Sequence, residues 1–139
     1  MKKILVILLA VGVSFALSKW IIFRNTKEVV EYTTAQAFQV GAFSNYENAK
    51  KCAERNQGIV VHDDEHYFVY VSVLTNPEAI ERLSDYYKSV GFPYYLKNIQ
   101  VRKDFTEKIK NDEDNLIDSH SDMFSSINYH VLQEFEKSL

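Results

Sequence analysis

The stretch QVGAFSNYENA, residues 39–49, aligns without a gap with YVSVLTNPEAI, residues 70–80. In each copy an apolar segment leads into a Ser-Asn or Thr-Asn pair, and such a pair is typical of the residue that caps the start of a helix. The alternation of apolar and other residues before the pair is typical of a strand. The sequence therefore predicts a strand–helix unit that occurs twice.

The residues around the two copies complete a predicted sheet. After a helix over 47–56, residues 59–62 and 67–74 have the composition of two strands joined by a turn at 63–65. A second helix begins at Asn76-Pro77 and ends near Gly91, and a last strand covers 94–101. We expect a βαββαβ order and a ferredoxin-like (RNP-like) α+β fold, with a four-stranded antiparallel sheet, two helices on one face and the other face open.

The first residues carry a membrane-targeting signal. Residues 4–17, ILVILLAVGVSFAL, are uncharged and follow Lys2 and Lys3, and apolar character resumes at Trp20. Counted through Phe23, the segment has about the 20 residues that span a bilayer. We expect an uncleaved N-terminal transmembrane helix with the remainder outside the cytoplasm; the alternative is a signal peptide cleaved after 16–18. The predicted organisation is an anchor at 1–24, a linker at 25–35, a domain at 36–102 and a helical extension at 103–139.

Composition and motifs disfavour several functions. The 139-residue chain has a formal net charge of −3 and one cysteine, Cys52, so nothing favours phosphate-backbone binding or an internal disulfide. It contains no phosphate loop, zinc-ligand spacing or nucleophile elbow. We therefore predict no catalytic residue, cofactor, metal or nucleic-acid partner. The cluster His62-Asp63-Asp64-Glu65-His66 is interpreted as a solvated turn. An RNA-binding module with the same order is disfavoured because residues 67–74 contain no Lys or Arg.

Strand alternation assigns side chains to the two sheet faces. Phe38, Val40, Val69 and Val71 should face the helices, and Phe43 should join their core. The side chains predicted to face away combine an amide, aromatic rings and a hydroxyl: Gln39, His66, Phe68, Tyr70 and Ser72.

The segment FQVGAFSNYENAKKCAERN resembles the opening signature of the SPOR family. The matching residues are Gln39, Val40, Gly41, Phe43, Asn48 and Ala49, and YFVYVSVL at 67–74 is similar to the second family hallmark. Ala42, Ser72 and Val73 depart from the family pattern. The resemblance implies non-catalytic binding of peptidoglycan glycan strands, particularly septal glycan stripped of its stem peptides, in cell division or sporulation.

The physics of an open sheet face agrees with that implication, because sugar rings expose apolar faces edged by hydroxyl groups. The resemblance points to Gln39 first as a glycan contact. Tyr70 and Phe68 have an alternative role, as residues packed beneath the C-terminal segment.

The end of the chain is predicted to be helical. Residues 102–114 are charged, whereas residues 121–139 place Phe124, Ile127, Val131 and Phe135 at steps of three and four, which makes an apolar stripe. We expect this helix to pack on its own domain, and the alternative is docking onto a partner protein. The second functional hypothesis is accordingly an envelope scaffold that uses the same fold for protein–protein contacts.

Overall fold

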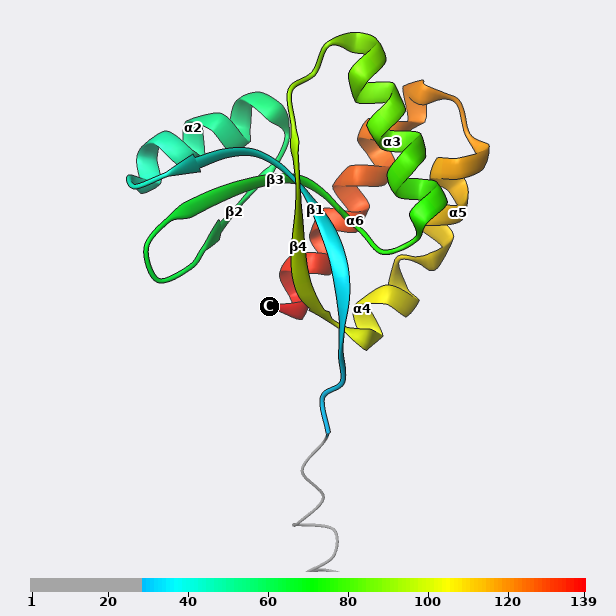
Figure 1. Cartoon of the computed structure of the whole chain (residues 1–139), viewed down its shortest axis with the longest axis horizontal. Helices are drawn as coiled ribbons and strands as arrows, with labels where there is room; N and C mark the ends of the chain where they lie inside the picture. Colours follow the sequence, from blue (N-terminus) through cyan, green and yellow to red (C-terminus); the bar gives the residue numbers. More distant parts are fainter. Residues whose placement is uncertain (1–28) are drawn as a thin grey trace, which may run out of the picture. The chain divides into compact units, whose positions relative to one another are not determined.

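The computed structural model describes residues 29–139, and within them Glu31–Leu139 forms one compact unit. It is an α+β fold with a four-stranded antiparallel sheet in the order β2-β3-β1-β4, surrounded by helices (Figure 1). The elements are β1 (Tyr32–Phe43), α2 (Tyr46–Asn56), β2 (Ile59–His62), β3 (Tyr67–Leu74), α3 (Pro77–Val90), β4 (Tyr95–Arg102), α4 (Lys103–Lys108), α5 (Lys110–Asp118), a 3₁₀ turn (Ser121–Met123) and α6 (Phe124–Ser138).

The two strand–helix units predicted from the internal repeat are present, and their helices start in the same way. Asn45 Oδ1 accepts hydrogen bonds from the backbone amides of Glu47 and Asn48 at 2.8 and 3.3 Å. Asn76 Oδ1 does the same for Glu78 at 2.9 Å. These side chains satisfy amides that have no partner inside the helix. The matching asparagines of the repeat are therefore the N-caps of α2 and α3.

The first strand is longer than the sequence indicates. The predicted linker at 25–35 is wrong at its C-terminal end, because Tyr32, Thr33 and Thr34 already pair with the last three residues of β4. The sequence gives no clear strand signal here, because the exposed residues are polar and the buried residues that alternate with them, Ala35 and Ala37, are small. The predicted anchor at 1–24 lies outside the described residues. Within 29–139, no helix is long and apolar enough to cross a bilayer.

Two register shifts interrupt the pairing of β1 with β3. Phe38 is opposite Ser72 and Gln39 is opposite Tyr70, so β3 contains one additional residue, Val71. At the second shift, between Gln39 and Gly41, the additional residue is Val40 on β1, so the two shifts offset each other. Such bulges change the side of the sheet to which neighbouring residues point. Ser72 and Tyr70 are two residues apart on one strand, yet their partners, Phe38 and Gln39, are consecutive on β1.

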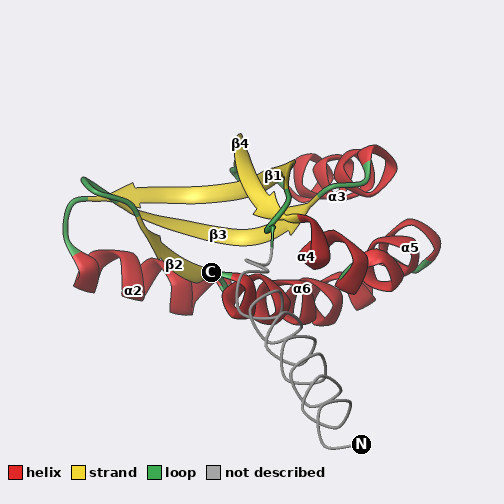
Figure 2. Cartoon of the chain, turned by 90° about the horizontal axis from the view of Figure 1, so that it is seen from below, coloured by secondary structure: helices red, strands yellow, loops and turns green. Residues whose placement is uncertain are grey.

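The C-terminal helices belong to the folded body, which confirms the expected packing of the apolar stripe. Phe124, Ile127, Val131 and Phe135 are all buried in the same apolar core as β3. The ring of Phe135 lies 5.6 Å from that of Phe105 on α4 and 6.3 Å from that of Tyr70 on β3. Figure 2 shows α6 beside α2, below the strands. The tail is therefore part of the folded body and packs on β3 next to α2.

A buried carboxylate joins the tail to the start of α3. Glu113 on α5 is only 2% exposed. It accepts a hydrogen bond from Thr75 Oγ1 at 2.7 Å and another from the backbone amide of Asn76. Burial raises the pKa of Glu113 above its ordinary value of 4.5, and these two hydrogen bonds oppose part of that rise. The carboxylate thus fixes α5 against the β3–α3 junction at the cost of a buried charge.

The raised pKa of Glu113 gives stability a predictable pH dependence. Between the ordinary pKa of 4.5 and the raised folded value, the folded state binds more protons, so the free energy of unfolding falls as pH rises through this interval. Glu113→Gln keeps an acceptor oxygen without the charge. We expect this variant to lack that fall and to equal or exceed the native chain at pH 7, in urea unfolding followed from pH 4 to 8.

Two further variants control this experiment. Asp114→Asn removes a neighbouring exposed charge that itself contributes to the raised pKa of Glu113, so it should narrow the pH interval of the fall without abolishing the fall. Glu113→Ala should cost about 1–3 kcal/mol, because it leaves the donors on Thr75 and Asn76 unpaired. Identical pH profiles for the native chain and Glu113→Gln would contradict the assignment.

Candidate functional site

Three of the residues predicted to face away from the helices form a row along β3 and the residue that precedes it. The rings of His66 and Phe68 are 6.1 Å apart, and those of Phe68 and Tyr70 are 6.3 Å apart and nearly parallel. Gln39 lies beside this row as the partner of Tyr70. His66 is exposed, and Phe68 and Gln39 are half-buried.

The predicted accessibility of Tyr70 is wrong. Its side chain is 3% exposed, because Phe135 from α6 covers this end of the row. Burial, together with the negative charge of Asp63, raises the pKa of the Tyr70 hydroxyl. Tyr70 is a core residue, which is the alternative that the sequence left open for it.

The predicted accessibility of Ser72 is also wrong. Ser72 is fully buried and lies opposite Phe38, whose ring packs 5.8 Å from that of Tyr87 on α3. The cause is the additional residue Val71, which places Ser72 on the other side of the strand from Tyr70. Strict alternation along β3 could not anticipate this change.

The part of the predicted surface that remains accessible is small, and a lysine side chain covers its main aromatic ring. Lys97 of β4 places its ammonium group 3.4 Å from the centre of the Phe68 ring, a cation–π contact on the face that a sugar would need. At the nearby turn, Asp63 accepts hydrogen bonds from the amides of Glu65 and His66, and these lower its pKa. Within residues 29–139, no three His, Cys, Asp or Glu side chains converge as metal ligands.

The accessible polar face of the sheet lies instead on the paired halves of β1 and β4. Thr34 is opposite Gln100 and Gln36 is opposite Asn98, and Gln100 Nε2 donates to Thr34 Oγ1 at 3.0 Å. The alternate residues of β1 point inward and are buried at Ala35 and Ala37. We call the outward-facing, uncharged set the β1–β4 strip; it consists of Tyr32, Thr34, Gln36, Asn98 and Gln100.

The strip borders two adjoining hollows. One, of about 420 Å³, lies between the strip and α3, and the other, of about 610 Å³, lies beside Tyr32. Thr34 and Thr75 line both hollows, so the two meet there. Ser84 of α3 also lines the first hollow; it is 7% exposed and its Oγ has no hydrogen-bond partner within the described residues.

Tyr32 closes the strip at one end with an exposed ring. Its side chain is 63% exposed and faces Arg102, which pairs with Asp104 at 3.2 Å. The amides, hydroxyls and ring of the strip therefore stand on a sheet whose inner face is packed. Sequence reasoning missed them because it placed 25–35 in a linker and did not assign the faces of the last strand, although the period of two in Thr34, Gln36, Asn98 and Gln100 is visible in the sequence.

A second concave surface lies between α2 and α6. It is a groove of about 850 Å³ in which Tyr129, 63% exposed, is the largest aromatic side chain. Ser125 Oγ donates to Gln57 Oε1 at 2.6 Å and so ties the end of α2 to α6. Carboxylates outnumber cations along the groove: Glu54, Asp122 and Glu136 against Lys50.

Comparison of the chain with protein-family models, with curated proteins and with solved structures finds no match in any of the three. Membership of the SPOR family remains a prediction that rests on the quoted residues.

The closure of the Tyr70 end by α6 can be tested through stability. Phe135→Ala removes a buried ring from between Tyr70 and Phe105 and should lower the free energy of unfolding by about 3–5 kcal/mol, measured in urea. Tyr129→Ala, an aromatic truncation on the exposed side of the same helix, should cost less than about 0.5 kcal/mol. Equal and small losses in both variants would show that α6 does not cover β3.

Proposed function

We propose that this protein is a non-catalytic binder of peptidoglycan glycan strands and that the β1–β4 strip is the contact surface. The observation that carries the proposal is a row of uncharged amide and hydroxyl side chains on one sheet face, beside the hollow between the strip and α3. These side chains are Thr34, Gln36, Asn98 and Gln100. Each amide both donates and accepts hydrogen bonds, as recognition of sugar hydroxyl and N-acetyl groups requires.

The shape of this surface also suits a polymer. From Tyr32 to Gln36 the strip extends about 14 Å along β1, and the hollows flank it along that length. The exposed ring of Tyr32 offers an apolar platform at one end, where a sugar ring can stack. An extended ligand can lie along the strands without any opening of the fold.

Charge favours the strip over the α2–α6 groove as the glycan surface. Peptide-free glycan keeps the carboxylate of each muramic acid unit, and like charges at short range are unfavourable. The side chains of the strip are uncharged. At its end Arg102 pairs with Asp104 and Lys103 pairs with Glu31, and Glu81 lines the first hollow, so cations and carboxylates are closer to balance there than in the groove, where three carboxylates accompany one lysine.

The wider assignment comes from the sequence. The SPOR-like segment at 38–56, the ferredoxin-like βαββαβ order and the predicted anchor at 1–24 support a single-pass protein of the cytoplasmic membrane with its domain in the cell envelope. A role in division or sporulation follows from the same resemblance.

A second candidate function is protein binding in the α2–α6 groove. The observation that favours it is the exposed Tyr129 beside buried Leu132 in this groove of about 850 Å³. This hypothesis predicts envelope localisation that does not depend on glycan.

Cosedimentation with purified sacculi tests the proposed function. The full chain should sediment with sacculi, and amidase treatment that removes stem peptides should increase the bound fraction. Asn98→Ala/Gln100→Ala should weaken binding about 10- to 30-fold, since two hydrogen bonds at about 1 kcal/mol each are lost. Both side chains are exposed, so the variant should have the same melting temperature as the native chain.

Matched variants locate the surface in the same assay. Tyr129→Ala/Gln133→Ala alters the α2–α6 groove, and Gln39→Ala alters the surface beside Phe68; both should bind sacculi as the native chain does. If folded Asn98→Ala/Gln100→Ala bound sacculi as tightly as the native chain, the strip would not be the contact surface. If the native chain did not bind sacculi, the proposal of glycan recognition would be contradicted.

A further inference from the structure

A separate cavity of about 260 Å³ lies where the end of α2 meets α3 and α6. Part of its lining is apolar and mostly aromatic, formed by Val71, Tyr86, Phe92 and Phe124, and the rest is polar and includes the carboxylate of Asp122. The rings of Tyr86 and Phe124 are 5.1 Å apart and perpendicular. Polar side chains from the ends of α2 and α6 surround the outer part, among them Gln57 and Ser125.

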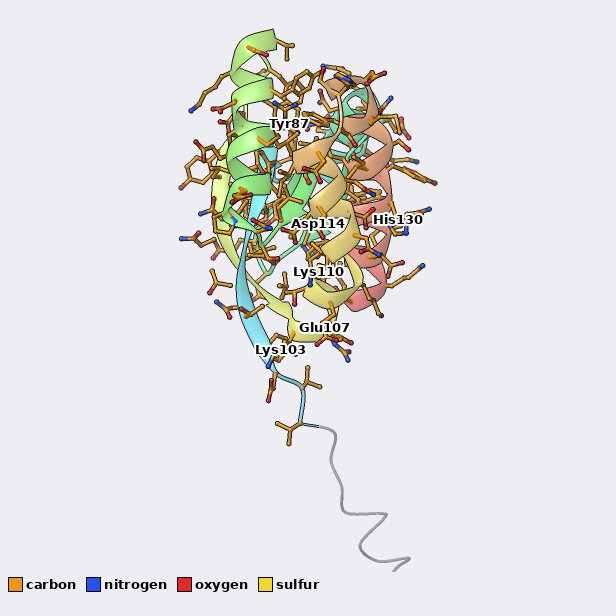
Figure 3. The ribbon with its side chains drawn as sticks, turned by 90° about the vertical axis from the view of Figure 1, so that its right-hand side faces the viewer. Tyr87, Lys103, Glu107, Lys110, Asp114 and His130 are labelled. Carbon is orange, nitrogen blue, oxygen red and sulfur yellow. The ribbon has the colours of Figure 1, made fainter. Side chains whose placement is uncertain are left out.

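One polar pair adjoins the apolar part of the lining. Asn128 of α6 is 7% exposed and donates from Nδ2 to the hydroxyl of Tyr87 at 3.3 Å. Its Oδ1 is buried and has no hydrogen-bond partner within the described residues. Figure 3 shows Tyr87 on the side of α3 that faces the C-terminal helices.

The pair offers both an acceptor and a donor to a ligand. Burial raises the pKa of the Tyr87 hydroxyl, so this group stays protonated at neutral pH. Whichever way the Asn128 amide is turned, one of its polar atoms remains unused after it bonds to Tyr87. A buried polar atom without a hydrogen-bond partner destabilises the fold, and a bound hydroxyl group would supply the missing partner.

The volume exceeds what a single water requires. A water molecule occupies about 30 Å³ in the liquid, whereas the cavity is several times larger and is lined by apolar and polar atoms alike. A concave pocket that combines aromatic side chains with converging polar groups is a usual form of a small-molecule site.

We propose that this cavity binds a small neutral compound with one six-membered ring and a hydroxyl group, which Asn128 and Tyr87 hold between Val71, Tyr86, Phe92 and Phe124. Such a ligand would contact β3, α3 and α6 at once and would stabilise their packing. The proposal does not depend on glycan binding, because the cavity shares no residue with the β1–β4 strip.

The test uses the full chain with phenol and toluene, which differ in the hydroxyl group. Phenol should shift the NMR signals of the Asn128 side-chain amide saturably, and toluene should bind about tenfold more weakly, as expected for the loss of one hydrogen bond. Free ligand is measured by equilibrium dialysis. Asn128→Leu keeps a similar volume without the polar group, so it should lose phenol affinity about tenfold and bind toluene at least as well as the native chain.

A second variant keeps the proposal testable if Asn128→Leu does not fold. Ser125→Phe adds a ring at an exposed position on the cavity's outer rim and should prevent phenol binding while α6 remains packed. The proposal is overturned if phenol causes no saturable shift at Asn128, if phenol and toluene bind the native chain equally, or if folded Asn128→Leu or Ser125→Phe keeps native phenol affinity.

Discussion

The whole of β3 from Val69 to Leu74 is buried, and this requirement determines the rest of the architecture. Side chains of a strand point alternately to its two sides, so burial of consecutive residues demands apolar cover on both. Helix α2 packs against Val69 through Ala49 and Ala53, and α3 meets Phe38 through Tyr87. The remaining cover comes from Phe135 of α6. A sheet with helices on one face alone would leave Tyr70 in water.

The need for this cover from α6 explains how the C-terminal helices are attached. Glu113 holds α5 to the β3–α3 junction through Thr75 and Asn76, and His130 of α6 contacts Asp112 of α5 at 2.8 Å. Because α6 takes the surface that a bare two-layer fold would leave open, the accessible polar part of the sheet moves to β1 and β4. The same packing creates the cavity at Asn128, where α6 meets α3.

Much of the fold could be predicted because its signals are local. The repeated Asn caps at 45 and 76 locate both helix starts, the hairpin turn at Asp63 separates two clear strands, and the apolar stripe of α6 has helical spacing. The register shifts around Val71 could not be predicted in this way, because a bulge is decided by pairing between strands and leaves the alternating pattern of either strand unchanged. The predicted accessibility failed at Ser72 for this reason, at Tyr70 because Phe135 of α6 covers its ring, and at Phe68 because Lys97 comes from another strand.

Backbone amide hydrogen exchange of the full chain, with and without soluble peptide-free glycan, tests the central claim most directly. The claim is that α6 closes the Tyr70 side of the sheet and leaves the β1–β4 strip as the surface for glycan. The account predicts slow exchange throughout β3 without ligand and added protection on β4 around Asn98 and Gln100 when glycan is present. Fast exchange in β3, or glycan protection confined to α2 and α6, would contradict it.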